Sequence, residues 1–536
     1  MSSSLLFVFM IFGYVFDLVS SASILPLPQS SIYDGNILSI DSDSFSFVIT
    51  STPSDLLQDA INRYSALTFL PMPPTNPINT TVIPVTGSIS LLTISVLSTD
   101  ETLALNTSEK YALTISVDGT ASITADTVYG ALRALETFSQ LVDYVVGTTF
   151  YIPCVVITDF PRFPHRGALV DTCRHFLPVN TLLTIIDALA YGKFNVLHWH
   201  IVDDQSFPYY SSAFPELSAM GAWNAPATTH VYSKSDVSRV ISYAKARGVR
   251  VVPEFDSPGH SQSWGLSQPG LLTQCYSNST GTPLPIEGSF GPIDPTVSTT
   301  WTFLSKFFSE VAQTFPDDYI HIGGDEVSYE CWASNPLINA WMATNNIQSY
   351  EALESYYVQK VINLISSLGK KVIGWQELVD NNLTLPEGTV VTAWKGGAAA
   401  GPAEMAKITS RGLRALLSAG WYLNYIAYGA QWAIDYPLDP QNMTSGGDDS
   451  LVMGGELAVW GEFVDATNVI NRIFPYGNAI GERLWSAKSV QNITDAGIRL
   501  HTLRCRYLAR NIPAEVANGP SFCPQEFNPS YIPPWN

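Results

Sequence analysis

The chain has 536 residues, and 27 Lys and Arg residues against 47 Asp and Glu residues give it a formal net charge of −20. This charge argues against a nucleic-acid partner, because a phosphate backbone binds a basic face and the sequence holds no dense Lys/Arg cluster. Hydrophobic residues make up 46% of the chain and aromatic residues 12%, so the chain can build large cores and is not mainly disordered.

Residues 1–22 have the pattern of a secretory signal peptide. The segment 5–19 is apolar except for Asp17, and small residues follow it. This run is shorter than the roughly 18 residues that a bilayer requires, and no later segment qualifies, so we expect no membrane span. The leader and the acidic composition predict a lysosomal or secreted protein. Six Asn-X-Ser/Thr sequons fit glycosylation on that route, at Asn79, Asn106, Asn278, Asn382, Asn442 and Asn492.

Residues 23–158 predict a separate α+β domain. Three short stretches rich in β-forming residues, at 45–49, 91–96 and 112–117, precede one helical run at 126–142 that carries a single apolar stripe. Strands and a helix in one segment of this length are typical of a small α+β domain.

Residues 159–536 predict an α/β fold, a (β/α)₈ barrel with a C-terminal extension. Apolar β runs alternate here with helical segments such as 179–191, 233–246, 300–314 and 349–368, which is typical of a parallel sheet. A doubly wound open sheet is the competing topology, but no Gly-rich phosphate loop follows the first strand. Eight β runs favour the closed barrel: 167–171, 195–202, 250–255, 319–323, 371–377, 389–395, 414–420 and 456–462.

Almost every predicted barrel strand ends in a side chain that can react or bind. The carboxyl ends of barrel strands meet at one rim, so these side chains should line one pocket. Asp325 and Glu326 follow two glycines, and one carboxyl could act as a general acid while the other orients the reacting group. The alternative interpretation is a loop acid that caps the next helix.

Three tryptophans at strand ends, Trp375, Trp394 and Trp460, predict a cage for the apolar face of a sugar ring. Barrel interiors are filled mainly by branched aliphatic residues, although core packing is the alternative role of these rings. Charged side chains nearby could hydrogen-bond the hydroxyls around that ring, or could equally form structural ion pairs: Arg166, Asp203 and Glu462.

His198 and His200 are separated by one residue, so on a strand both would face the same side. Such a pair can bind a metal in hydrolytic amidohydrolases, which is a second candidate enzyme class. That mechanism needs further ligands at other strand ends, where the sequence offers Trp375 and Trp394 instead. We therefore expect the pair to brace the pocket, and we expect no metal and no cofactor.

Five motifs together resemble family 20 of the glycoside hydrolases, with the best match to eukaryotic lysosomal or secreted β-N-acetylhexosaminidases. The resemblance covers most of the chain from about residue 161 onward, and on weaker evidence it extends to the N-terminal domain. The motifs are HRG at 165–167 with DTCRH at 171–175, HWHIVDDQSFP at 198–208, PEFDSPGH at 253–260, HIGGDE at 321–326 and WGE at 460–462.

The resemblance implies exo-hydrolysis of terminal β-linked N-acetylglucosamine or N-acetylgalactosamine from a glycan, with retention at the anomeric carbon. In this family the acetamido oxygen of the substrate attacks, and an oxazolinium intermediate forms. By motif position, Glu326 is the general acid and base, Asp325 holds the acetamido N–H, and Tyr422 donates to the acetamido oxygen. The remaining implied substrate contacts are Arg166, Asp203, His260, Trp375, Trp394, Asn424, Trp460 and Glu462.

The resemblance also implies two disulfides, Cys275 with Cys331 and Cys505 with Cys523. Cys173 stands where relatives carry Ser, so we expect that its thiol could be free of a disulfide. Asn424 matches one subgroup, but Tyr425 follows it where that subgroup has Arg, which disfavours a clamp for sulfated or sialylated substrates. Family members commonly dimerise, which makes a homodimer a candidate assembly. The competing function is glycan binding on an inactive hydrolase scaffold.

Overall fold

A computed structural model describes residues 24–70, 84–145, 149–227, 229–277, 280–284, 290–523 and 526. The predicted signal peptide and the sequons at Asn79 and Asn278 lie outside these residues. The other sequon residues, Asn106, Asn382, Asn442 and Asn492, are exposed, as glycosylation requires.

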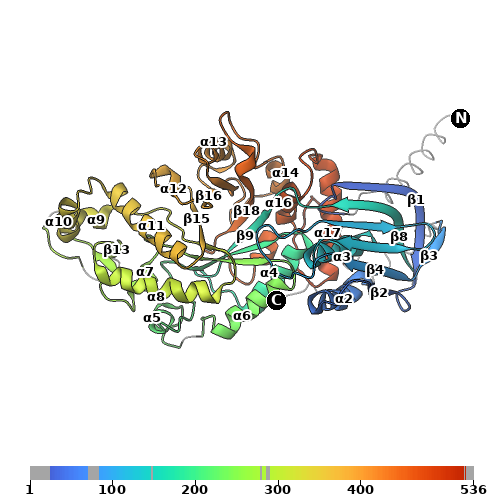
Figure 1. The fold of residues 1–536 in the computed structure, drawn as a ribbon, viewed down its shortest axis with the longest axis horizontal. Coiled ribbons are helices and arrows are strands. Elements are labelled where there is room, and N and C mark those ends of the chain that lie inside the picture. The colour runs from blue at the N-terminus through green and yellow to red at the C-terminus, as the bar shows by residue number, and fades with distance from the viewer. Residues whose placement is uncertain are drawn as a thin grey trace.

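The N-terminal region is an eight-stranded mixed sheet with two helices, α2 and α3, packed together. The sheet order is β2-β4-β6-β5-β8-β1-β3, and β7 pairs with β8. This sheet lies at one end of the molecule, beside the barrel (Figure 1). Its elements are β1 (Ser30–Ile40), β2 (Ser46–Ile49), α2 (Asp55–Thr68), β3 (Gly87–Ile89), β4 (Leu91–Val96), β5 (Tyr111–Ile115), β6 (Ala121–Ala125), α3 (Val128–Leu141), β7 (Asp143–Val145) and β8 (Thr149–Asp159).

Helix α3 is buried along its whole length. One side packs on β4, β5 and β6, and the other faces the barrel, where Arg133 donates to the carbonyls of Phe194 and Gly248. The three predicted β stretches form β2, β4 and β5, and the predicted helix is α3. The sequence analysis did not identify α2 or the long antiparallel pair β1 and β8, whose register shifts between Tyr33 and Ile37.

The second region is a closed barrel of eight parallel strands, which confirms the predicted fold. The strand order around the barrel is β10-β11-β14-β15-β16-β17-β18-β9. Strand β14 ends earlier than predicted because Gly323 and Gly324 adopt φ values of +66° and +89°. The strands are β9 (His165–Asp171), β10 (Val196–Val202), β11 (Arg250–Phe255), β14 (Tyr319–His321), β15 (Lys371–Trp375), β16 (Val390–Ala393), β17 (Arg414–Leu417) and β18 (Val452–Val459).

Helices surround the barrel, and the four predicted ones are present. The long helices are α4 (Val179–Tyr191), α6 (Lys234–Lys245), α8 (Ser298–Thr314), α11 (Tyr350–Ser367), α13 (Gly397–Thr409), α16 (Tyr476–Trp485) and α17 (Ile493–Ala509). Shorter elements in the loops are α5 (Glu216–Gly221), α7 (Gln262–Gly265), β12 (Leu272–Gln274), β13 (Phe290–Ile293), α9 (Glu330–Ser334), α10 (Pro336–Thr344), α12 (Glu377–Asp380), α14 (Gln431–Asp435), η1 (Asp449–Leu451) and α15 (Val469–Ile473). Among the described residues, no helix has the length and apolarity of a membrane span.

The N-terminal domain docks on the amino end of the barrel through buried charges. Arg166, at the start of β9, is fully buried, and its Nη2 lies 2.5 Å from Glu109 Oε2 of the N-terminal domain. Glu109 also pairs with Arg133 at 2.7 Å, and Lys193 pairs with Asp159 at 2.8 Å. Every one of these charges has an opposite charge beside it, which is what allows charges to remain buried.

This position corrects the expectation that Arg166 binds substrate. Its Nε donates to the Lys193 carbonyl and its Nη1 to the Phe163 carbonyl, so the guanidinium is committed to the domain interface. Substrate pockets of such barrels lie at the carboxyl ends of the strands, and Arg166 lies at the other end.

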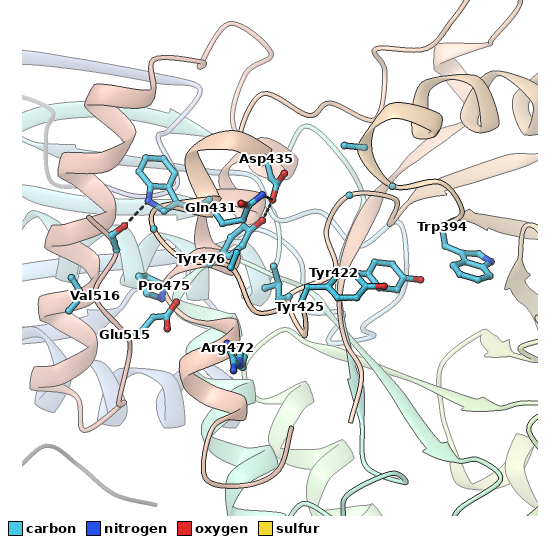
Figure 2. Close-up of a pocket in the computed structure, with 18 of the residues that line it drawn as sticks. Trp394, Tyr422, Tyr425, Gln431, Asp435, Arg472, Pro475, Tyr476, Glu515 and Val516 are labelled. Carbon is cyan, nitrogen blue, oxygen red and sulfur yellow. Dashed lines mark hydrogen bonds between the residues drawn. The ribbon is translucent and has the colours of Figure 1, made fainter. Parts of the chain in front are cut away.

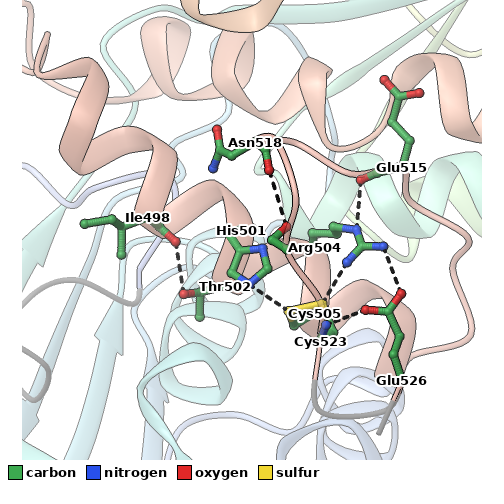
Figure 3. The surroundings of a disulfide bond; sticks show 10 residues. Ile498, His501, Thr502, Arg504, Cys505, Glu515, Asn518, Cys523 and Glu526 are labelled. Carbon is green, nitrogen blue, oxygen red and sulfur yellow. Dashed lines mark hydrogen bonds and ion pairs between the residues drawn. A yellow bond between two sulfur atoms is a disulfide. The ribbon is translucent and has the colours of Figure 1, made fainter. Parts of the chain in front are cut away.

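Both expected disulfides are present, and the other two cysteines, Cys154 and Cys173, are free and buried. The Cys275–Cys331 bond joins loops that follow β11 and β14. The Cys505–Cys523 bond ties the C-terminal segment to α17, and Figure 3 shows Arg504 and Glu526 beside it. The C-terminal extension is thereby fixed against the barrel.

Candidate active site

A cavity of about 500 Å³ opens at the carboxyl rim of the barrel. Its lining comes from the ends of six strands, which is how a barrel assembles a site from distant parts of the chain. The residues that line it are Arg174, His260, Asp325, Glu326, Trp394, Tyr422, Asn424, Tyr425, Ile426, Trp460, Glu462 and Phe463.

The turn after β14 presents the two adjacent carboxyls. A Cβ at Gly323 would lie 1.7 Å from Asp256 Oδ1, so only glycine fits there. Asp256 accepts a hydrogen bond of 2.8 Å from the Gly324 N–H and holds the turn. Glu326 then adopts φ +50°, an uncommon value for a residue with a side chain, and backbone strain of this kind is concentrated at functional sites.

Asp325 is buried at the base of this cavity. Within the described part of the chain its Oδ1 has no hydrogen-bond partner, so this atom is available for a ligand N–H. Burial raises the pKa of Asp325, and the negative charge of Glu254 adds to the effect, while the positive charge of His260 opposes both. The pKa of Asp325 thus depends on burial and on the charges of two neighbouring side chains.

Glu326 is open to solvent, with a side chain that is 61% exposed. Its Oε2 lies 3.6 Å from His260 Nε2, and this contact holds the pKa of Glu326 below its ordinary value. The pKa values of the two adjacent carboxyls are thus shifted in opposite directions, upward for Asp325 and downward for Glu326, because their surroundings differ in burial and in charge.

His260 connects the acid pair to a buried support. Its Nδ1 lies 3.2 Å from Asp203 Oδ1, and its Nε2 lies 3.8 Å from Asp325 Oδ2. Burial alone would lower the pKa of His260, but the hydrogen bonds with Asp203 and Glu326 raise it well above the ordinary value. Asp203 itself is fully buried, and it also pairs with His200 and Arg174, so it supports the residues that line the cavity.

Aromatic rings form the walls. Trp394 and Trp460 line the cavity, and Trp375 is buried beneath them with ring centroids 6.4 and 6.0 Å away. Trp375 Nε1 donates to Glu254 Oε1 at 2.9 Å, and Trp394 Nε1 donates to Glu377 Oε2 at 3.1 Å. Fixed indole rings that face a cavity suit the apolar face of a sugar.

Tyr422 stacks on Trp394 with centroids 6.5 Å apart. Burial raises the pKa of Tyr422 well above 10, so its phenol stays protonated and can donate a hydrogen bond. Asn424 also lines the cavity, and its Oδ1 is buried without a partner among the described residues. Glu462 lies exposed at the rim.

Arg174 is the residue that the sequence analysis missed. It follows β9 at the carboxyl rim and lines the cavity, with Nη1 and Nη2 each 2.8 Å from a buried carboxylate, those of Asp171 and Asp203. Its guanidinium also lies 5.1 Å from the Trp460 ring. The signal was available, since Arg174 ends the DTCR run after the first predicted strand.

A buried network of histidines and carboxylates supports the cavity from within the barrel. Glu254 lies 2.6 Å from His200 Nδ1, 3.0 Å from His198 Nε2 and 3.1 Å from His321 Nδ1. Burial alone would raise the pKa of Glu254, but these histidines hold it well below its ordinary value. The ring nitrogens of His198 and His200 are engaged with carboxylates, which supports the expected bracing role for the pair.

Asp256 is another residue near the cavity to which the sequence analysis gave no role. Its carboxyl oxygens lie within 4.8 Å of those of Glu254 and Asp325. Burial, together with the negative charge of Asp325, raises the pKa of Asp256 well above its ordinary value. Like charges this close oppose ionisation, and among the three carboxyls the pKa of Asp256 is raised well above its ordinary value while that of Glu254 is lowered.

A (β/α)₈ barrel whose rim pocket joins two adjacent carboxyls with an aromatic cage is an arrangement that suits a glycoside hydrolase. The model for the catalytic domain of glycosyl hydrolase family 20 matches residues 163–488, and a model described as beta-acetyl hexosaminidase like matches residues 24–141. The chain belongs to glycosyl hydrolase family 20.

Named relatives agree with this assignment. The chain is 50% identical to beta-hexosaminidase subunit beta of Mus musculus over 414 residues, which cover 77% of this chain and 75% of that protein. It is 44% identical to the subunit alpha of Rattus norvegicus over 449 residues, which cover 83% of each. The chitobiase structure of Flavobacterium johnsoniae superimposes with a TM-score of 0.76 at 28% identity, over 90% of this chain and 72% of that one.

Proposed function

We propose that this cavity removes terminal β-linked N-acetylglucosamine or N-acetylgalactosamine from the non-reducing end of glycans, by substrate-assisted hydrolysis with retention. The observation that carries the proposal is Asp325. A buried carboxyl with one unpartnered oxygen beside a proton donor fits a substrate that supplies its own nucleophile and needs its N–H held.

In the first step Glu326 gives its proton to the glycosidic oxygen and the bond between that oxygen and C1 breaks. The acetamido oxygen of the bound sugar forms a bond to C1 on the opposite face, which gives an oxazolinium ion. In the second step Glu326 takes a proton from water, the water oxygen attacks C1, and the ring opens to the free sugar. The two displacements together retain the anomeric configuration.

Asp325 Oδ1 accepts the acetamido N–H and stabilises the positive charge that grows on nitrogen as the ring closes. Tyr422 donates to the acetamido oxygen and orients it toward C1. Both groups act through position, since fixing an internal nucleophile near its target lowers the barrier without a second enzyme carboxylate at C1.

The remaining contacts select the ring. Trp375, Trp394 and Trp460 enclose its apolar face, and the charged groups Arg174 and Glu462 with Asn424 are placed for hydroxyls. Trp375 is buried beneath the other two indole rings, so we expect a terminal sugar to rest against this end of the cavity, which supports exo-cleavage. Arg174 takes the role that the sequence analysis gave to Arg166.

The experiment compares an aryl β-N-acetylglucosaminide with the corresponding aryl β-glucoside, which lacks the acetamido group. We expect hydrolysis of the first alone, and inhibition of it by a thiazoline that mimics the bicyclic intermediate. Equal turnover of both glycosides would contradict the internal nucleophile, and binding without hydrolysis would indicate the inactive scaffold.

We propose in addition that the chain enters the secretory route, for lysosomal delivery or secretion, and that it pairs with a second copy. The support for the route is the leader pattern, the exposed sequons and two disulfides, which persist in oxidising compartments. The support for pairing is that the relatives are named as subunits. Light scattering of the purified chain measures its mass, and a monomer at micromolar concentration would contradict the pairing.

A further inference from the structure

A second cavity of about 490 Å³ adjoins the active site. Trp394, Tyr422 and Tyr425 line both cavities, so the aromatic rings form a wall with an open space on each side. Figure 2 shows Tyr422 and Tyr425 in the middle of this space, Trp394 on one side, and Glu515 with Arg472 on the other. Asp325 and Glu326 are not in its lining, so a ligand held there would not be cleaved.

The far wall is held by specific contacts between distant segments. Trp432 Nε1, on α14, donates to the Ala517 carbonyl at 2.9 Å. Asp435 accepts from Gln431 Nε2 at 3.1 Å and from the Tyr476 hydroxyl. The cavity is therefore a built feature that joins α14, α16 and the segment after α17.

Its polar groups indicate a neutral ligand. Arg472 Nε is buried and has no partner within the described residues, and no ion pair there includes its guanidinium. Glu515 shares the cavity, and burial raises its pKa while the positive charge of Arg472 opposes the shift. Arg472 is the one cation in the described lining of this cavity, and the same lining holds the carboxyls of Glu515 and Asp435, so the cavity offers no excess of positive charge for an anion.

Aromatic faces beside planar donors and acceptors are the chemistry of saccharide binding, and a cavity of this volume accepts a small oligosaccharide arm. We propose that this second cavity binds a neutral saccharide, most directly the non-reacting arm of a branched glycan whose other arm occupies the active site. This second proposal rests on the proposed hydrolysis of glycans. It adds a saccharide-binding site on the far side of the Tyr422–Tyr425 wall.

The first test compares two substrates in one set of variants. The substrates are an aryl β-N-acetylglucosaminide and a branched oligosaccharide with two terminal β-linked N-acetylglucosamine arms. For Arg472→Met we expect the KM of the branched substrate to rise at least fivefold with kcat unchanged, and kcat/KM of the aryl substrate to stay within twofold. Arg239→Met, an exposed arginine of α6 that lines neither cavity, is the matched control and should change neither.

A second variant tests the same cavity without changing Arg472 and without removing a buried side chain that could affect folding. Val516 lines the cavity and is 48% exposed, so Val516→Trp fills space without removing a buried group. It should raise the KM of the branched substrate in the same way. Unchanged KM in both variants would overturn the assignment to a branched arm, and an equal loss on the aryl substrate would overturn the proposal as a whole. Continued hydrolysis of the aryl substrate would leave the proposed function standing.

A binding measurement distinguishes a free saccharide from the arm of a bound branched glycan. With the active site filled by the thiazoline, chitobiose is titrated into wild-type protein and into Arg472→Met. Saturable binding in the wild type that is weakened at least fivefold in the variant, without a KM effect on the branched substrate, assigns the cavity to free saccharide instead of an arm. No binding together with no KM effect contradicts both sources.

Discussion

Two arginines lie at opposite ends of the first barrel strand, and their surroundings differ. Arg166, at the amino end of β9, is fully buried and bonded to the N-terminal domain. Arg174, just beyond the carboxyl end, lines the active-site cavity and is bonded to Asp171 and Asp203. The two residues are of the same type and both lie in recognisable sequence motifs, so neither feature tells their roles apart. The direction of the strand does, because it decides which arginine lies at the carboxyl rim.

The two ends of the barrel differ in the same way. At the amino end, the buried charges Glu109, Arg133, Asp159, Arg166 and Lys193 are all paired. At the carboxyl rim, Asp325 and Asn424 have buried oxygens without partners among the described residues, and Glu326 has a left-handed backbone. Satisfied charges secure the domain interface, and unsatisfied groups remain where a ligand completes them.

The largest expected effect is at the acid pair. Glu326→Gln should lower kcat/KM for an aryl β-N-acetylglucosaminide about 10³-fold, because the proton donor is lost. Asp325→Asn should lower it about 10²- to 10³-fold, because an amide does not stabilise the positive charge on nitrogen. Thermal unfolding should be unchanged for Glu326→Gln, since that side chain is exposed. Near-normal turnover in either variant would reject these roles.

The arginine pair tests the comparison directly. Arg166→Met should lower the free energy of unfolding by about 3 kcal/mol, because Glu109 loses one of its two cations in a buried site. The folded fraction should keep its kcat/KM. Arg174→Met should lower kcat/KM about 10- to 100-fold, mostly through KM, because charge-assisted hydrogen bonds to hydroxyls are lost. If the two variants exchange these outcomes, the assignment of the ends is wrong.

The pH profile tests the link between His260 and the acids. The positive charge of His260 lowers the pKa of Glu326 and opposes the rise in the pKa of Asp325, so its removal raises both values. The active form needs Glu326 protonated and Asp325 ionised. In His260→Asn both limbs of kcat/KM against pH should therefore move to higher pH, in addition to any loss of rate. A profile with unmoved limbs would show that His260 does not control the pair.

The smallest effect concerns stability against pH at the two ends. Burial alone would raise the pKa of Glu109, but Arg166 and Arg133 lower it, so its stabilising contribution is present above the unfolded pKa and is lost as the pH falls. Burial raises the pKa of Glu354, near the rim, to about 7, so the folded state is penalised as the pH rises from about 4.5 to 7.

Unfolding temperatures of Glu109→Gln and Glu354→Gln, measured across this range, check the signs. Glu354→Gln should reduce the loss of stability between pH 4.5 and 7, and Glu109→Gln should reduce the loss at lower pH. If the unfolding temperature changed with pH in the same way in both variants, the contrast between the two ends of the barrel would be wrong.

The sequence by itself determined the barrel and the two adjacent carboxyls at the end of one of its strands. Its eight apolar runs could form buried parallel strands, and the Gly-Gly-Asp-Glu turn could place two carboxyls at a strand end whatever surrounded them, because both features depend on local pattern. The tryptophans at strand ends were likewise readable in the chain. The resemblance to the family predicted two disulfide bonds in addition, and the structure confirms both.

Only the tertiary structure decided which arginine lines the rim cavity, which buried carboxyl has a pKa raised well above its ordinary value, and that a second cavity lies behind Tyr422. Each of these depends on groups that are far apart in the sequence, such as Glu109 beside Arg166 or Asp256 beside Asp325. Burial and charge at a site are sums over all neighbours in space, and a linear pattern does not contain those neighbours.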